Sequence, residues 1–205
     1  LLFMFTDILS LFRLSPHPKM PAPRALILLT NGVEDSEIVV TTDCLRRAGF
    51  EVVLGGLSGL DVITCCQKTR LLPDVAVEEA VKTTFDVIIV TGGSGSGETF
   101  AQSTKVGEIL RSQLAAGRYV ATICVGALVL GTHCIQKGSK ITSYPMAREK
   151  LEQAGYTFSE ESVVVDGKLI TSRAPGTVFD FALKIVELIV GPKEANDLQN
   201  LMLFK

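Results

Sequence analysis

Short apolar runs alternate along the chain with segments in which apolar residues recur at helical spacing. The runs have the continuous apolar character of strands buried in a parallel sheet; they are Arg24–Thr30, Glu51–Leu57, Phe85–Thr91 and Tyr119–Ile123. Helical spacing predicts helices over Asp35–Ala48, Glu98–Ala116 and Gly126–Leu130. This alternation, with short connections, predicts one three-layer α/β domain around a mostly parallel sheet.

The last third of the chain adds a hairpin and a helix. Val163–Val165 and Lys168–Thr171 flank an Asp-Gly pair, which is a strong signal for a tight hairpin turn. Thr177 is expected to cap a final long helix, with Asp180 in the capping-box position. Gly191 and Pro192 are expected to end that helix.

The N-terminal segment differs from the rest. Residues 1–22 are expected to be an extension, and residues 23–205 the α/β domain. The longest unbroken apolar run, Leu1–Phe5, is too short to span a bilayer, so no integral membrane association is expected. Arg13 and Lys19 follow the apolar part, unlike the basic start of a secretory signal. A mitochondrial targeting segment and an irregular tail both stay open.

Composition narrows the chemistry. The 205 residues carry a net charge of −2 with scattered lysines and arginines, which argues against a nucleic-acid partner. Five cysteines, an odd number, favour free thiols in a reducing compartment over a disulfide framework. Only two histidines are present, and no CxxC or HExxH motif occurs, so no metal site is expected.

Cys124 is the leading candidate for a nucleophile. It lies where the strand ending at Ile123 runs into helix-prone residues, and a tight strand-to-helix turn presents a side chain above the sheet. The helix N-terminus would favour a thiolate there, and Gly126 suits the close packing of such a turn. A small buried core cysteine is the competing interpretation.

Two further segments end at the same predicted edge of the sheet. The glycine-rich stretch Gly92–Gly97 does not match a dinucleotide fingerprint, but its backbone N–H groups could face an oxyanion beside Cys124. A flexible turn is the alternative. Glu34, Asp35 and Glu37 follow the first strand; one could serve as a proton donor, but spacing alone favours a solvated helical turn.

The remaining histidine and cysteines have weaker arguments. His133 would face away from Cys124 on a shared helix, which counts against a cysteine peptidase. Cys44 is expected in the core. Cys65 and Cys66 form an adjacent pair in a loop, where a disulfide between them would be strained and exposed modification sites stay open. No specific argument attaches to Cys134.

Six stretches, taken in their order along the chain, resemble the DJ-one family of protein deglycases within the ThiJ/PfpI superfamily. They are RALILLTNGVEDSE (24–37), LRRAGFEVVLGGLSG (45–59), DVIIVTGG (86–93), ATICVGA (121–127), GSKITS (138–143) and ITSRAPGTVFDFALKIVE (170–187). The likeness extends from residue 24 to about residue 190 and implies a flavodoxin-like sandwich that forms a homodimer.

The resemblance also implies site residues. By position, Cys124 is similar to the family's oxidation-sensitive nucleophile and Glu37 to the carboxyl that hydrogen-bonds it. Gly92, Gly93 and Val125 correspond to backbone donors for an oxyanion. The family residues that line the site at the dimer interface correspond in this chain to Arg47, Pro175 and Tyr144. The chain departs from the family at Tyr144, where a histidine is usual, at Gln67, usually arginine, and at Thr91, usually proline.

The function implied is a stress-protective, glutathione-independent glyoxalase or protein deglycase acting on methylglyoxal and related small aldehydes. A protonated Glu37 is expected to lower the pKa of the Cys124 thiol while its own pKa rises. Cys124 would also sense oxidation. A redox-regulated chaperone with little turnover is the alternative, and a cysteine peptidase comes third. The expected location is the cytoplasm, with nucleus and mitochondrion left open.

Overall fold

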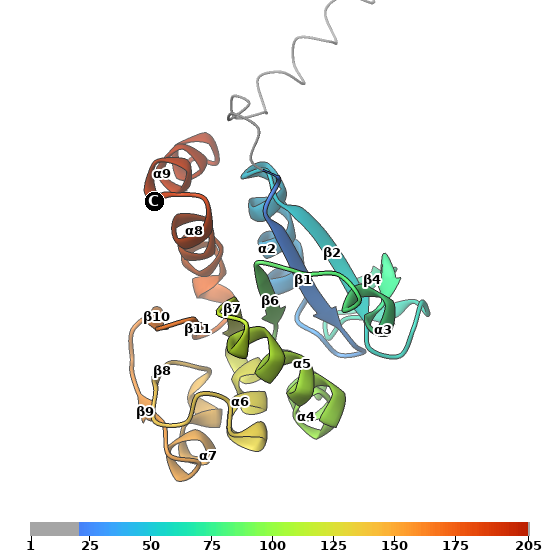
Figure 1. Cartoon of the computed structure of the whole chain (residues 1–205), viewed down its shortest axis with the longest axis vertical. Coiled ribbons are helices and arrows are strands. Elements are labelled where there is room, and N and C mark those ends of the chain that lie inside the picture. The colour runs from blue at the N-terminus through green and yellow to red at the C-terminus, as the bar shows by residue number, and fades with distance from the viewer. Residues whose placement is uncertain (1–20, 205) are drawn as a thin grey trace, which may run out of the picture.

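A seven-stranded sheet forms the centre of the computed structural model, which describes residues 21–204 (Figure 1). The expectations for residues 1–20 lie outside these residues. The strand order is β10-β11-β7-β6-β1-β2-β5, and only β10 runs antiparallel to its neighbour. The strands are β1 (Arg24–Leu29), β2 (Glu51–Gly56), β5 (Val75–Ala76), β6 (Val87–Val90), β7 (Tyr119–Ile123), β10 (Val163–Asp166) and β11 (Leu169–Ser172).

Two small sheets flank the main one. Strands β3 (Ile63–Thr64) and β4 (Arg70–Leu71) pair antiparallel, and β8 (Lys140–Ile141) pairs parallel with β9 (Thr157–Phe158). The helices are α2 (Asp35–Arg47), α3 (Val77–Ala80), α4 (Ser96–Gln102), α5 (Thr104–Ala115), α6 (Leu128–His133), α7 (Arg148–Gln153), α8 (Val178–Ile189) and α9 (Pro192–Leu201). Three single turns of 3₁₀ helix are η1 (Cys124–Ala127), η2 (Pro145–Ala147) and η3 (Pro175–Thr177).

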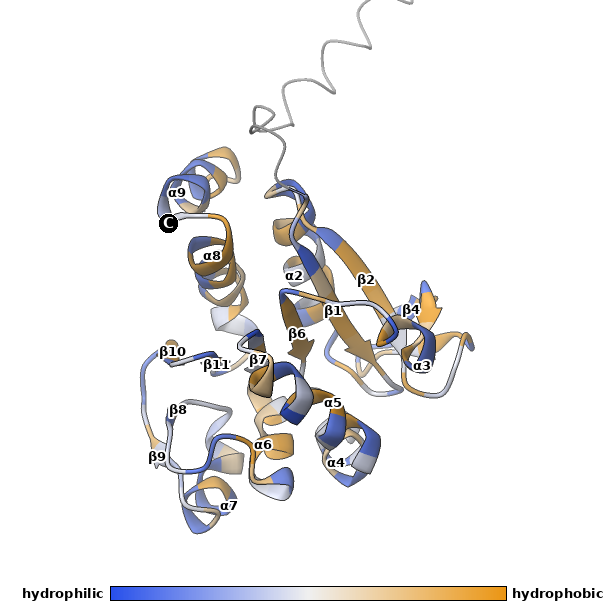
Figure 2. Cartoon of the chain, in the orientation of Figure 1, coloured by the Kyte–Doolittle hydropathy of each residue, from blue (hydrophilic) through white to orange (hydrophobic). Residues whose placement is uncertain are grey.

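The helices form two groups around the sheet. α2 packs against α8 and α8 against α9, while α4, α5 and α6 pack on one another (Figure 1). Strand β1 is covered on both faces, so Ala25 through Leu29 are fully buried. That double cover explains the unbroken apolar run in the sequence, and Figure 2 shows β1 and β6 as hydrophobic. The fold is the flavodoxin-like α/β domain with a mostly parallel sheet that was expected.

The hairpin prediction is confirmed, but one predicted helix is divided. β10 and β11 pair antiparallel around Asp166 and Gly167. The segment predicted as one helix over Glu98–Ala116 is two helices, because Ser103 ends α4 and its hydroxyl caps α5 by accepting from the Val106 N–H at 3.3 Å.

Two expectations for the C-terminal part are wrong. The Thr177 hydroxyl lies 2.7 Å from the Ser172 hydroxyl and also bonds the backbone of Ala174, so it makes no capping bond to α8. Helix α8 is also not the last one, since Pro192 occupies the first turn of α9, where its missing N–H costs nothing. None of the helices in residues 21–204 is long and apolar enough to cross a membrane.

Candidate active site

The ends of three neighbouring strands converge on one small region. Strands β2 and β5 lie on one side of β1 in the sheet, and β6, β7 and β11 lie on the other. The direction in which successive strands are added therefore reverses between β1 and β6. In open parallel sheets ligands bind outside the carboxyl ends of the strands at such a reversal. The segments beyond β1, β6 and β7 carry Glu37, Gly92 and Cys124 respectively.

Cys124 sits on a strained turn between strand and helix. It follows β7 directly, begins η1, and has a positive φ of 59°, which is unusual for a residue with a side chain. A side chain on Gly126 would come within 2.7 Å of the Val90 and Thr91 carbonyl oxygens, so a glycine is required there. The predicted elbow is therefore present, with a 3₁₀ turn leading into α6, and Cys124 is only 7% exposed.

Glu37 is a buried acid held beside this cysteine. It lies in the first turn of α2 and is fully buried, so the solvated turn favoured by spacing is wrong for Glu37. Its Oε2 accepts a 2.7 Å hydrogen bond from the Gly92 N–H. Among the described residues its Oε1 has no nitrogen or oxygen partner, and the Cys124 thiol hydrogen-bonds the carboxyl. Carboxyl and thiol therefore form a pair closed off from water.

The pair binds protons more tightly than either group does in water. Burial, followed by weaker effects that include the charge of Glu34, raises the pKa of Glu37 to about 7. Burial and then the Glu37 charge raise the pKa of Cys124 to about 12. The expected lowering of the thiol pKa is thus wrong while Glu37 is ionised, although the expected rise for Glu37 is confirmed. Between these values the pair holds one proton, shared by oxygen and sulfur.

The three backbone donors differ in what they face. The Gly92 N–H is taken by Glu37, so Gly92 orients the carboxyl and is not free as the oxyanion donor that was expected. Gly93, with φ of 127°, bridges to Val33, and its own N–H makes no backbone hydrogen bond in the described part of the chain. The Val125 N–H hydrogen-bonds the Cys124 sulfur. Gly93 and Val125 remain as candidate donors.

The glycine-rich loop is held against its neighbours. The Glu34 N–H donates to the Gly92 carbonyl at 2.8 Å, next to the bridge between Val33 and Gly93. A side chain on Gly92 would lie 2.6 Å from Cβ and 2.8 Å from Sγ of Cys124. The interpretation of this stretch as a flexible turn therefore does not hold for Gly92 and Gly93.

Not all of the residues expected at a dimer interface lie near the Cys124–Glu37 pair. Arg47 lies at the other end of α2, about 15 Å of helix axis from Glu37, and pairs with Asp43 at 3.0 Å. Pro175 begins η3 just beyond β11, the neighbour of β7. Tyr144 is 40% exposed and precedes η2, which packs beside η1. Within this single chain, Arg47 is remote from Cys124, and the interface role of all three stays a prediction.

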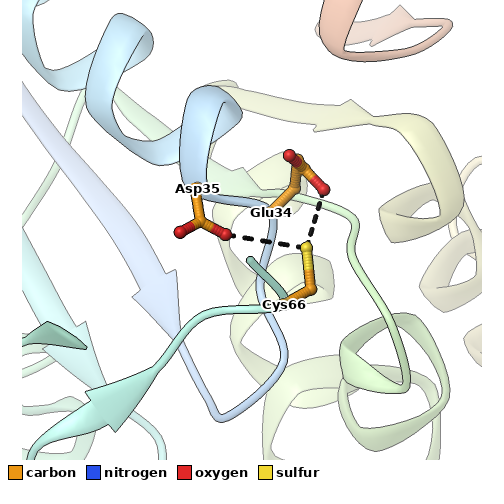
Figure 3. Close-up of side chains that lie close together, drawn as sticks. All are labelled: Glu34, Asp35 and Cys66. Atoms are coloured by element: carbon orange, nitrogen blue, oxygen red, sulfur yellow. Dashed lines mark hydrogen bonds between the residues drawn. The ribbon is translucent and has the colours of Figure 1, made fainter. Parts of the chain in front are cut away.

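His133 and the other thiols lie apart from the nucleophile. The His133 ring packs on α5, where a side chain added to Gly107 would come within 2.4 Å of Nδ1. Cys44 is buried in the core as expected, Cys134 is exposed, and all five cysteines are free. Cys66 Sγ lies 2.8 Å from Glu34 Oε2 (Figure 3). No local sequence pattern predicts this contact, because the two residues are distant in sequence and only the fold brings them together.

Both the sequence and the fold of this chain are similar to those of known proteins. The sequence model of the DJ-1/PfpI family matches residues 23–188. The Caenorhabditis elegans glutathione-independent glyoxalase DJR-1.2 is 38% identical over 175 residues, covering 85% of this chain and 92% of its own. The crystal structure of Drosophila melanogaster DJ-1beta superposes with a TM-score of 0.87 at 36% identity, over 90% of this chain and all of that one.

A second solved structure, oxidized Toxoplasma gondii DJ-1, gives a TM-score of 0.84 at 28% identity, over 89% of this chain and 99% of that one. Both solved structures therefore have the same overall fold as this chain. The match of the family model over most of the chain, together with these relatives, shows that the chain belongs to the DJ-1/PfpI family.

Proposed function

We propose that the protein is a glutathione-independent glyoxalase with deglycase-like activity, which converts methylglyoxal and related small aldehydes through Cys124. The observation that carries this proposal is the buried Cys124–Glu37 pair, which shares one proton above pH about 7. The name of the Caenorhabditis elegans relative supports the same activity. The proposed reaction is an addition of water across methylglyoxal that yields lactate, with no cofactor required.

The first step uses the pair in its less populated arrangement, with the proton on Glu37 and the charge on sulfur. The Cys124 thiolate adds to the aldehyde carbon, and the aldehyde oxygen takes the proton from Glu37, which gives a hemithioacetal and leaves Glu37 as the carboxylate. The N–H of Gly93 makes no backbone hydrogen bond within residues 21–204, so it is a suitable donor to that oxygen as charge develops on it. The strained backbone at Cys124 holds the sulfur at the carboxyl end of β7, beside Glu37.

The second step is a proton transfer between neighbouring carbons. Glu37 as carboxylate removes the proton from the former aldehyde carbon and returns it to the former ketone carbon. The hydroxyl proton on the former aldehyde oxygen passes to the former ketone oxygen, which leaves a thioester of lactate. Water then hydrolyses the thioester, releasing lactate and the Cys124 thiol. A carboxyl with pKa about 7 suits both halves of this transfer at neutral pH.

The proposal is tested by incubating the full chain with methylglyoxal in the absence of glutathione. We expect lactate to accumulate in proportion to methylglyoxal consumed, measured with an enzymatic lactate assay or by proton NMR. Consumption of methylglyoxal without lactate would indicate stoichiometric trapping by thiols and amines and would contradict a glyoxalase.

Redox sensing at Cys124 is a second candidate function, supported by the Glu37 carboxyl and Val125 N–H next to the sulfur, which could hold a sulfinate. In a peroxide titration followed by mass spectrometry, we expect the Cys124 peptide to gain two oxygen atoms, about 32 Da. The exposed Cys134 serves as an internal control. Sensing is refuted if Cys134 is oxidised at lower peroxide than Cys124.

If Cys124 is oxidised in that titration and no lactate forms in the turnover assay, the protein is a redox-regulated chaperone or signalling protein. A cysteine peptidase has the least support. His133, the histidine of the described residues, packs against Gly107, and no hydrogen bond joins its ring to Cys124.

A further inference from the structure

A second thiol and two carboxylates lie together at the start of α2 (Figure 3). Cys66 Sγ is 2.8 Å from Glu34 Oε2 and 3.7 Å from Asp35 Oδ2, and the three ligand atoms all lie within 4.8 Å of one another. All three residues are partly buried. The set is distinct from the Cys124–Glu37 pair and takes no part in the proposed reaction.

Backbone hydrogen bonds fix the three residues relative to one another. Cys66 lies in the turn between β3 and β4, and its N–H donates to the Val33 carbonyl at 2.9 Å. The Asp35 carboxylate accepts from the Gln67 N–H at 2.7 Å and the Thr69 N–H at 3.0 Å. Each carboxylate oxygen has a second lone pair, so Asp35 can brace the turn and still bind a cation.

The negative charge of this region has no cationic partner. In the part of the chain that the structure describes, no lysine or arginine forms an ion pair with Glu34, Asp35 or Glu37. Glu34 and Asp35 therefore place two neighbouring, partly buried carboxylates beside Cys66, and a bound cation would supply the missing counter-charge.

The donor set and its spacing select the kind of cation. Two ligands of a tetrahedral zinc ion, one sulfur and one oxygen, lie about 3.5 Å apart when the metal–ligand bonds have their usual lengths. The two sulfur–oxygen distances at Cys66, 2.8 Å and 3.7 Å, fall on either side of that separation. A thiolate with two carboxylates suits a borderline-soft ion such as Zn²⁺, whereas Mg²⁺ and Ca²⁺ prefer oxygen ligands alone.

We propose that Cys66, Glu34 and Asp35 form a binding site for a divalent transition-metal ion of the zinc type, with water in the remaining position. Binding forms a bond between the metal and Cys66 Sγ, and the thiol proton passes to solvent. No redox change is involved. This inference does not depend on the proposed glyoxalase activity, because none of the three residues takes part in that reaction.

The test is a titration of the full, reduced, metal-free chain with Zn²⁺ by isothermal calorimetry, and with Co²⁺ by absorption spectroscopy. We expect one site per chain, and a charge-transfer band from sulfur to cobalt that reports thiolate coordination. Cys66→Ser should abolish the band and weaken Zn²⁺ binding by more than about 100-fold, since even second-shell changes weaken metal sites by 10- to 100-fold. Glu34→Gln should weaken binding while preserving the thiol.

Serine variants of two other cysteines identify which sulfur atom binds the metal. Cys65→Ser removes the neighbouring buried thiol, Cys124→Ser removes the nucleophile, and both should retain the cobalt band and the Zn²⁺ affinity. Loss of binding in Cys124→Ser with retention in Cys66→Ser would overturn the proposal, because the metal would then sit on the Cys124–Glu37 pair. Circular dichroism checks that Cys66→Ser is folded, and retained binding in Glu34→Gln with an unchanged band would also overturn the site.

Discussion

Replacing Cys124 with serine is expected to abolish lactate formation from methylglyoxal, with a fall in kcat/KM of at least about 10³-fold. A serine hydroxyl is far less acidic than a thiol. Within residues 21–204, the histidine ring, that of His133, packs against Gly107 and is not placed to activate position 124. The substitution changes one atom of a buried side chain and keeps the backbone, so the fold should persist. Lactate production and thermal unfolding of the variant and the natural chain measure the two effects.

The matched control is Cys134→Ser. Cys134 is also a free cysteine with positive φ, but it is exposed at the end of α6, so its replacement should leave lactate formation unchanged. Turnover that survives in Cys124→Ser would eliminate covalent catalysis by this residue. Turnover lost in both variants would point to a general effect of thiol removal.

Replacing Glu37 with glutamine is expected to remove turnover while stabilising the fold at alkaline pH. The amide cannot carry the proton between carbons, so lactate formation should fall by about 10²- to 10⁴-fold. The amide oxygen can still accept the Gly92 N–H, which keeps the loop in place. A variant that is more stable but inactive would separate the chemical role of Glu37 from a structural one.

The raised pKa of Glu37 explains why its replacement is expected to stabilise the fold at alkaline pH and not at acidic pH. The unfolded chain releases the Glu37 proton near pH 4.5, whereas the folded chain holds it up to about pH 7. Stability therefore falls as pH rises between these values, by up to about 3 kcal/mol, and the loss is complete above pH 7. Glutamine has no such loss, so the variant should gain stability at pH 8 and none at pH 4.

Urea denaturation at the two pH values measures this difference. Glu108→Gln is the control, because Glu108 is exposed on α5 and its replacement should change stability little at either pH. Equal effects of Glu37→Gln at pH 4 and pH 8 would mean that Glu37 titrates as it does in the unfolded chain. The buried pair described above would then be incorrect.

Much of the fold can be predicted from the sequence because its strongest signals are local. The apolar run at Arg24–Leu29 has one physical explanation, burial on both faces of the sheet, and the turn at Asp166 and Gly167 requires a hairpin. The break at Ser103 was not predicted, because a serine inside a helical pattern can face solvent or cap a new helix.

The site could be predicted in part. The position of Cys124 at a strand-to-helix joint is a local signal, and family resemblance identified Glu37 where spacing favoured a solvated acid. The raised pKa of Cys124 could not be deduced, because it depends on burial and on a charge from another segment. The same holds for Cys66, which contacts Glu34 only because the β3–β4 turn folds over the start of α2.

The close packing of glycines around the nucleophile makes the site vulnerable to mutation well beyond its reacting residues. A methyl group at Gly92 would collide with the Cys124 side chain, one at Gly97 with the Val125 carbonyl 2.7 Å away, and one at Gly126 with the end of β6. Substitution at any of the three would move Cys124 or Val125 without altering a reacting atom. Inactivating alleles of this protein are therefore expected to accumulate at positions that have no chemistry of their own.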